Sequence, residues 1–578
     1  MTPSCAARAI LAAAVASSAA HASIHDQIFA GRFDIPADAP ANANDAARFL
    51  TQATFGPTTA DVQYVMAVGV SEWIDEQLAK APTLGEPTVE AVVTARTNNG
   101  QNVGQVQRLN RWYWQATYAP DQLRQRMAFA LSQIFVISDQ AAGLGKDYVE
   151  MSAYYDMLAS DAFVSYRQIL GDVTYHPEMG QYLNAFHNVK GSASTSPDEN
   201  YAREVMQLFS IGLIQRNSDF SPVLDAGLTV PTYAQGTITE TAKVFTGFTY
   251  SDAPISPPSF FGGGYTYASR AAPMACWGLE LFGAGSNNMR HDIGAKNVVA
   301  SYVGGVSVPN TIPANQTCGT DVGDELNILA SHANVAPFIS RQLIQRFVSS
   351  NPTPAYIQRV ANVFVTSNGD LGDVLKAILT DSEARNPPPL VAGDSYGKLR
   401  EPILRLTAMW RAFGAIAPAA DQYGEIDMLP KSNGSLQLAF GQSPLESPTV
   451  FNFYLPDYQA PGAFVDNNLY SPELQITNES TTYSTSDVYY NFTANAVQAP
   501  LTDRPQITFA AFGATPTAAA IVSAINADML YGTMSATMQT SLTTMVSGLL
   551  SASPPPSLEP EWSAIYVTML SPEYATQR

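Results

Sequence analysis

Leu123-Arg-Gln-Arg-Met-Ala-Phe-Ala-Leu-Ser-Gln-Ile-Phe135 is the stretch that points most directly to the fold class. Its apolar residues recur at the spacing of one helix face: Leu123, Met127, Leu131 and Ile134. Pro120 stands just before it, at the start of a helix, where the missing N–H of proline costs nothing. The stretch therefore predicts a helix with one buried stripe.

Helical patterns continue on both sides of this stretch. Thr58 with Asp61, and Thr237 with Glu240, have the spacing of capping boxes, which would explain Glu240 structurally. Further segments with helical spacing are Tyr148 to Phe186, Asn334 to Val348, Leu371 to Leu379, Lys398 to Phe413, Ala518 to Leu550 and Glu559 to Leu570. The sequence predicts a mainly α fold: one large multi-helix globular domain over residues 44–578.

Two segments lack this pattern. Residues 251–321 are rich in Gly, Pro, Ser and aromatic residues, which predicts an irregular, short-stranded insertion. Residues 478–498 are rich in Ser, Thr, Tyr and Asn, and we expect a long polar surface loop or short strands there. The tyrosines between Tyr483 and Tyr490 could stack on sugars or peptides, or could simply pack that loop down.

The N-terminus predicts export. Arg8 supplies a positive charge, a short apolar run follows, and Ala20-His21-Ala22 matches the small-x-small cleavage pattern. We expect a Sec-type signal peptide over residues 1–22, cleaved after Ala22, and an N-terminal extension over residues 23–43. Because no later apolar stretch is long enough to span a bilayer, we expect no integral membrane segment and a soluble protein in the periplasm or outside the cell.

The charge balance limits the classes of binding partner, and the cysteine content predicts a disulfide. The 30 Lys and Arg stand against 50 Asp and Glu, which argues against nucleic acid and anionic membrane surfaces as partners. After removal of the signal peptide only Cys276 and Cys318 remain. Two thiols in an oxidising compartment predict one disulfide, and without CxxC spacing they make a poor zinc site.

Eight segments together carry a family resemblance. They are residues 47–57 (ARFLTQATFGP), 123–135, 199–208 (ENYAREVMQL), 242–248 (AKVFTGF), 291–296 (HDIGAK), His332 with 339–343 (ISRQL), 399–402 (LREP) and 447–454 (SPTVFNFY). In this order they resemble the bacterial family called domain of unknown function 1800. The resemblance implies export, a mainly helical fold, and frequent encoding beside a sulfatase-like family, domain of unknown function 1501.

The resemblance supplies no activity, and three positions depart from it. Many members carry histidines where this chain has Ser132 and Ile134, and another where Phe209 stands. If those histidines bind metal in other members, this chain lacks part of that site.

Histidines and carboxylates within the family-like segments form one candidate site. His291, Asp292 and His332, joined by Glu204, are residue types that bind a divalent metal. His332 precedes Asn334, a plausible helix N-cap, which favours its neutral, metal-binding form. The alternative is helix capping and structural hydrogen bonding, since the spacing contains no HxxxH signature.

Glu204 has two interpretations. It falls on the shoulder of a helix face, where it could be a general base with a raised pKa. It could equally be a buried strut that pairs with an arginine of another helix: Arg124, Arg126 or Arg341.

Cations are scarce in this acidic chain and form a third set of candidates. Lys296, Lys398 and Arg400 could gather around an anionic ligand, and Arg203 and Arg341 are further candidate ligand-binding residues. The alternatives are charge pairing at helix ends and, for Arg203, a surface bridge to Glu199 four residues earlier.

Two functions follow as hypotheses. The first is a periplasmic or cell-surface binding or assembly protein that acts with a sulfatase-like neighbour. The second is a secreted hydrolase of extracellular polymers or esters, with a divalent metal as its candidate cofactor. The sequence has no GxSxG elbow, phosphate-binding glycine loop or dinucleotide fingerprint, so we expect no nucleotide cofactor.

Overall fold

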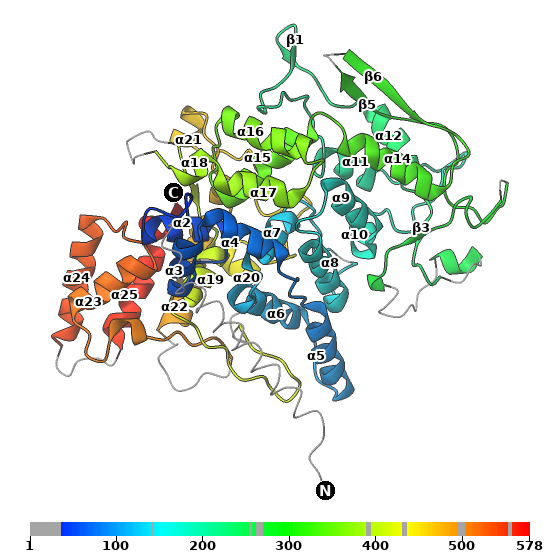
Figure 1. Cartoon of the computed structure of the whole chain (residues 1–578). Helices are drawn as coiled ribbons and strands as arrows, with labels where there is room; N and C mark the ends of the chain where they lie inside the picture. The colour runs from blue at the N-terminus through cyan, green and yellow to red at the C-terminus, as the bar shows by residue number, and fades with distance from the viewer. Residues whose placement is uncertain are drawn as a thin grey trace.

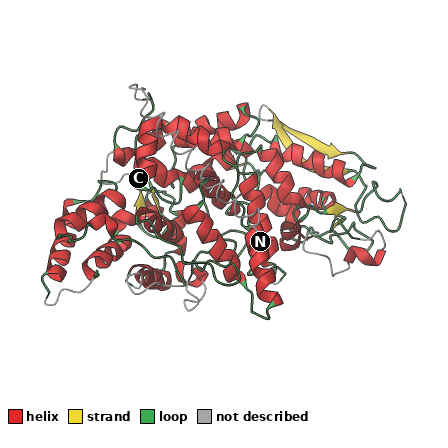
Figure 2. Ribbon diagram, turned by 60° about the horizontal axis from the view of Figure 1, so that its bottom comes forward, coloured by secondary structure: helices red, strands yellow, loops and turns green. Residues whose placement is uncertain are grey.

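The structure is a computed structural model that describes residues 36–141, 143–253, 257–261, 270–283, 285–303, 306–388, 395–429, 436–494, 503–552 and 558–578. It is mainly helical, as predicted, with helices throughout and strands confined to small pairs (Figures 1 and 2). The signal peptide predicted over residues 1–22, and most of the extension that follows it, lie outside the described residues.

The helices follow one another along the chain as α2 (Ala43–Ala53), α3 (Thr59–Val68), α4 (Val70–Ala79), α5 (Glu86–Asn98), α6 (Gln105–Tyr118), α7 (Gln122–Ser132), α8 (Tyr148–Ser160), α9 (Tyr166–Tyr175), α10 (Pro177–Tyr182), α11 (Asn200–Gln207), α12 (Gln235–Val244), α14 (Cys318–Ala330), α15 (Val335–Phe347), α16 (Pro354–Thr366), α17 (Leu371–Thr380), α18 (Ser382–Arg385), α19 (Pro402–Ala412), α20 (Leu436–Phe440), α21 (Ala463–Asp466), α22 (Glu479–Thr493), α23 (Ala518–Asp528), α24 (Ala536–Leu550), α25 (Glu559–Leu570) and α26 (Pro572–Ala575). Short 3-10 turns lie at η1 (Pro257–Phe261), η2 (Pro472–Ile476) and η4 (Ala510–Phe512).

Helix α7 lies at the centre of the molecule. It packs against α2, α4, α6, α8 and α15 (Figure 1). The predicted apolar stripe is buried, and so is every other residue of α7. Its polar side chains tolerate burial because they bind backbone carbonyl groups: the Arg124 guanidinium donates to the oxygens of Ala159 and Ser160.

One contiguous apolar core connects the two ends of the described chain. Buried side chains run from Ala46 in α2 to Tyr574 in α26 without a break. The last residues are also tied in by hydrogen bonding, because β8 (Thr576–Gln577) pairs with β7 (Lys398–Leu399). No helix among the described residues has the length and apolarity needed to cross a bilayer.

The predicted short-stranded insertion contains the longest strands. β5 (Lys296–Val303) and β6 (Val306–Ile312) form an antiparallel hairpin, seen at the upper right of Figure 1. The other pairs are β3 (Phe248–Thr249) with β4 (Ala275–Cys276), and β1 (Leu224–Asp225) with β2 (Leu228–Thr229). Helix α14 already begins at Cys318, inside the segment predicted to be irregular.

The predicted polar loop over residues 478–498 is wrong where the structure describes it. Residues 479–493 form α22, and Asn478 caps it by accepting from the Thr481 N–H. The hydroxyl groups that suggested a loop bind carbonyl oxygens instead, as Thr493 does to Tyr489. The run of tyrosines is therefore helical: Tyr489 is buried, whereas Tyr483 is exposed.

The capping predictions have mixed outcomes. Thr58 and Asp61 form the expected capping box at α3. The predicted box at Thr237 is wrong, because α12 already begins at Gln235. Glu240 instead accepts a hydrogen bond from Lys243 at 2.5 Å.

Candidate functional site

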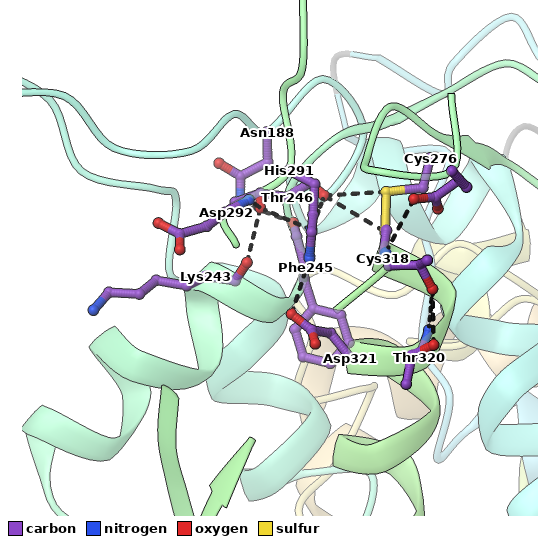
Figure 3. Close-up of a disulfide and its surroundings, with 12 residues drawn as sticks. Asn188, Lys243, Phe245, Thr246, Cys276, His291, Asp292, Cys318, Thr320 and Asp321 are labelled. Carbon is purple, nitrogen blue, oxygen red and sulfur yellow. Dashed lines mark hydrogen bonds and ion pairs between the residues drawn. A yellow bond between two sulfur atoms is a disulfide. The ribbon is translucent and has the colours of Figure 1, made fainter. Parts of the chain in front are cut away.

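His291 is a buried structural residue. Its Nε2 lies 3.0 Å from Asp321 Oδ2, and its Nδ1 lies 2.9 Å from the Thr246 carbonyl oxygen (Figure 3). Both ring nitrogens are therefore engaged by groups of the fold. His291 therefore joins the segment after α12 to the first turn of α14.

The predicted disulfide is present beside this histidine. Cys276 in β4 is bonded to Cys318 at the start of α14, with 6.2 Å between the two Cα atoms. These cysteines and His291 form the one group of metal-ligand side chains that gathers closely in the described part of the chain. Because the sulfurs are bonded to each other, the group offers no thiolates and is a covalent strut.

The predicted metal site of His291, Asp292 and His332 is not formed. His291 contacts Asp321 in the first turn of α14, whereas His332 follows the last turn, about 14 Å further along at the usual rise of a helix. The Asp292 carboxylate points away from the His291 ring and accepts from the Gly294 N–H at 2.8 Å (Figure 3).

His332 has the structural role that was the alternative prediction. Its Nδ1 accepts from the Asn334 N–H at 3.1 Å, at the start of α15. Burial lowers the pKa of His332 to about 4, so its predicted neutral form is confirmed.

The predicted anion-binding lysine and its neighbours are also committed to the fold. Lys296 is fully buried, and its ammonium donates to the carbonyl oxygens of Asp292 and Gly294 and, at 2.5 Å, to Asp321 Oδ2. Burial alone would raise the pKa of Asp321, but the hydrogen bonds from His291 and Lys296 hold it below its ordinary value. Arg203 forms the expected bridge to Glu199 at 3.3 Å.

Lys398 and Arg400 lie in another part of the molecule. Lys398 is buried and pairs with Glu473 at 2.8 Å. The Arg400 guanidinium stacks over the Tyr574 ring and donates to its carbonyl oxygen at 3.3 Å. The predicted cluster of these two residues with Lys296 is therefore not formed.

Glu204 forms no ion pair within 4 Å among the described residues, so the predicted strut to an arginine is wrong. Arg124 and Arg126 donate to backbone carbonyl groups, and Arg341 donates to the Pro456 oxygen at 3.2 Å. The Glu204 side chain is buried in α11, and its Oε2 has no hydrogen-bond partner among the described residues. Burial raises the pKa of Glu204 to about 7, with a small opposing effect of Arg203.

A cleft of about 340 Å³ includes part of α11 in its wall, although Glu204 is not among its lining residues. Gln207 and Leu208, one turn after Glu204, form part of its wall. The remaining wall comes from the end of α7, the segment after α11, α15, and the chain between α20 and η2: Gln133, Ile134, Gly212, Leu213, Ile214, Arg216, Phe220, Phe338, Arg341, Gln342, Arg346, Val450, Phe451, Asn452, Tyr454, Leu455, Pro456, Asp457 and Tyr470.

A buried polar network fixes the back wall of this cleft. Glu401 Oε1 accepts from the Tyr454 hydroxyl at 2.5 Å and from Gln133 Nε2 at 2.9 Å, and both of these residues line the cleft. Burial alone would raise the pKa of Glu401, but Lys398 and Arg126 lower it to about 2. The carboxylate therefore stays ionised and holds the two wall residues in place.

A larger hollow of about 660 Å³ lies between α2 and the C-terminal residues. Two of the arginines that line it already donate to the backbone. Arg48 donates to the carbonyl oxygens of Ala384 and Arg385, and Arg400 donates to the carbonyl oxygen of Tyr574. Glu573 accepts from the backbone and hydroxyl of Ser535. The smaller cleft is the better candidate site, because its wall residues Gln342 and Arg346 carry buried donors without a partner among the described residues.

Comparison with known proteins identifies the family. A model of the family described as protein of unknown function (DUF1800) matches residues 48–576. The chain belongs to the DUF1800 family. No curated protein and no solved structure matches it.

The segments that carry the DUF1800 resemblance converge on the cleft. Four of the eight contribute to its wall: residues 123–135, 199–208, 339–343 and 447–454. A fifth, residues 399–402, supplies Glu401 behind the wall. Arg341 was among the residues predicted from the sequence, whereas Arg216, Arg346 and the aromatic wall residues were not. The one sequence signal for them is that several of the family-like segments contribute to the same wall.

Proposed function

We propose that this DUF1800 protein is an exported binding protein, at the cell surface or in the periplasm, and that the cleft is its ligand-binding site. The convergence of four family-like segments on one cleft carries the proposal. Its volume falls within the range of small-ligand sites, and apolar residues with a few polar groups line it, as such sites require. The ligand is a small molecule or one unit of a polymer.

Blocking the cleft tests this function. Leu213 lines the cleft and is 54% exposed, so Leu213→Trp fills the opening without disturbing the core. Leu228→Trp is the matched control, because Leu228 is 74% exposed in β2 and is not part of the wall. A fragment library would be screened against all three proteins by ligand-observed NMR.

We expect binders of the wild type that Leu213→Trp loses and Leu228→Trp retains. Binders that Leu213→Trp leaves unchanged would place ligand binding elsewhere and contradict the proposal.

The proposal also includes export of the protein and a protein partner. The signal-like N-terminus supports export. The family resemblance supports a sulfatase-like protein of the domain-of-unknown-function 1501 family as the partner. Purified mature protein should retain that neighbour in a pull-down, and repeated recovery of the bait alone would contradict the partnership.

A secreted hydrolase is the second candidate, and Glu204 is the observation that favours it. A buried, unpaired carboxyl with a pKa of about 7 can exchange protons near neutrality, as a general base does. The metal-assisted form has no support, because the predicted ligands lie apart. An ester or glycoside that the wild type hydrolyses and a folded Glu204→Gln variant does not would favour this candidate.

Glu204→Gln also has an expected effect on stability. The folded-state pKa of about 7 lies above the ordinary 4.5, so Glu204 favours the folded state at low pH. That contribution is lost as the pH rises from 4.5 through 7. Between pH 5 and pH 7 the wild type should lose roughly 2 kcal/mol more unfolding free energy than the variant.

The measurement is urea unfolding at a series of pH values. Glu479→Gln, at an exposed position in α22, is the control and should keep the wild-type profile. A Glu204→Gln profile parallel to that of the wild type would show that this carboxyl is not held protonated.

A further inference from the structure

Three guanidinium groups meet at one wall of the cleft. Arg216, Arg341 and Arg346 all line it, and Asp457 is the one carboxylate among the lining residues. The Arg341 guanidinium lies between two aromatic rings, 4.8 Å from the Phe220 centroid and 4.7 Å from that of Tyr470. This wall is therefore strongly cationic in a chain whose net charge is −20.

The positive charges of these arginines repel one another. Burial lowers the pKa of Arg341 to about 10, and the charges of Arg216 and Arg346 act in the same direction, against an opposing effect of Asp457. Arg341 stays charged at neutral pH, and like charges gathered in a partly dry wall are unfavourable unless an anion compensates them.

Nearby carboxylates compensate these charges only in part, since Asp457 is one carboxylate against three arginines. Glu401 and Glu473 lie behind the wall, where they are balanced by two buried cations, Lys398 and Arg126. No ion pair within 4 Å joins Arg216, Arg341 or Arg346 to a carboxylate of the described chain. The inner network is thus neutral, and the excess positive charge belongs to the cleft.

Two residues of this wall carry unsatisfied donors. Arg346 is 1% exposed, and its Nε and Nη1 have no hydrogen-bond partner among the described residues. The side-chain nitrogen of Gln342, also a wall residue, is unpartnered as well. A buried donor without a partner is costly, and an oxyanion is the acceptor that satisfies guanidinium groups best.

Much of the remaining wall is apolar. Phe338 and Phe451 contribute aromatic rings, and Leu208, Leu213, Ile214, Val450, Leu455 and Pro456 add aliphatic surface. A ligand that fills the cleft must therefore carry an apolar or aromatic body next to its charged group.

We infer that the cleft binds an organic anion, whose carboxylate, sulfate or phosphate group is held by Arg341 and Arg346 and whose apolar or aromatic body lies against the remaining wall. This inference rests on the proposed function, in that the cleft must be the ligand site. It names the class of ligand: an oxyanion attached to an apolar body.

The test compares two probes of equal shape. 2-Naphthalenesulfonate carries an oxyanion, and 2-naphthalenesulfonamide is its neutral counterpart. Isothermal titration would give the affinity of each for the mature wild-type protein and for Arg341→Gln, Arg346→Gln and Leu213→Trp. Arg359→Gln is the control, because Arg359 pairs with Asp381 and Glu383 on α16's exposed side and is not part of the wall.

We expect the wild type to bind the sulfonate about 10- to 100-fold more tightly than the sulfonamide, as charge-assisted hydrogen bonds require. Each cleft arginine variant should lose about that preference and keep its affinity for the sulfonamide. Arg359→Gln should match the wild type, and added salt should weaken binding of the sulfonate only. Thermal unfolding of each variant separates loss of binding from loss of fold.

Two negative outcomes are distinguishable. Equal affinities for the two probes, both abolished by Leu213→Trp, would overturn the anion inference while leaving the cleft as the binding site. Binding of both probes that survives Leu213→Trp would contradict the proposed function itself, and with it this inference.

Discussion

Asp321→Asn should lower the unfolding free energy by about 3–5 kcal/mol at pH 7, the usual cost of removing one partner from a buried ion pair. Asp321 is fully buried and accepts from both His291 and Lys296. With a neutral side chain there, the Lys296 ammonium keeps only two carbonyl oxygens and remains buried with its charge unpaired.

Chemical denaturation of the two proteins measures this loss. Asp324→Asn, one turn along the same helix, is the control: Asp324 is half-buried, accepts from Gln316 at 2.9 Å and forms no ion pair with a described residue. The control should lose less than about 1 kcal/mol. A loss equally small in Asp321→Asn would mean that water or another group compensates Lys296.

Replacing both cysteines, Cys276→Ser with Cys318→Ser, should cost roughly 4 kcal/mol. The bond closes a loop with a sequence separation of 42, and a loop of that length restricts the unfolded chain by about this free energy. A reductant should lower the stability of the wild type by the same amount and leave the double variant unchanged.

The disulfide and Asp321 act on the same element. Cys318 is the first residue of α14 and Asp321 lies in its first turn, so the two losses should not be additive when combined. A reductant that leaves the unfolding midpoint of the wild type unchanged would contradict the account of the disulfide as a strut.

Helices with apolar periodicity were predictable from the sequence. The pattern over residues 559–570 matches α25, and that over 334–348 matches α15 within one residue at each end. Helix α22 was not predictable in this way, because its many Ser, Thr and Tyr residues favour loops when considered in isolation. Burial of Val488, Tyr489 and Phe492 against the core overrides that local preference.

The candidate site was harder to predict from the sequence than the helices, because residue types alone suggested which side chains would act together. Histidine beside aspartate suggests a metal, yet His291 binds Asp321, thirty residues away, in a structural pair. The cleft arginines come from α15 and from the segment after α11, and Tyr470 from beyond α21. Their meeting depends on the tertiary packing of helices, which spacing along the chain does not encode.

A crystal soaked with 4-bromobenzenesulfonate tests the central claim most directly, because the bromine marks the apolar body and the sulfonate its charged end. The account predicts an anomalous peak for bromine inside the cleft, near Phe338 or Phe451, with the sulfonate oxygens hydrogen-bonded to Arg341 or Arg346. A bromine peak elsewhere on the molecule with the cleft unchanged, or a sulfonate turned away from the arginines, would contradict it.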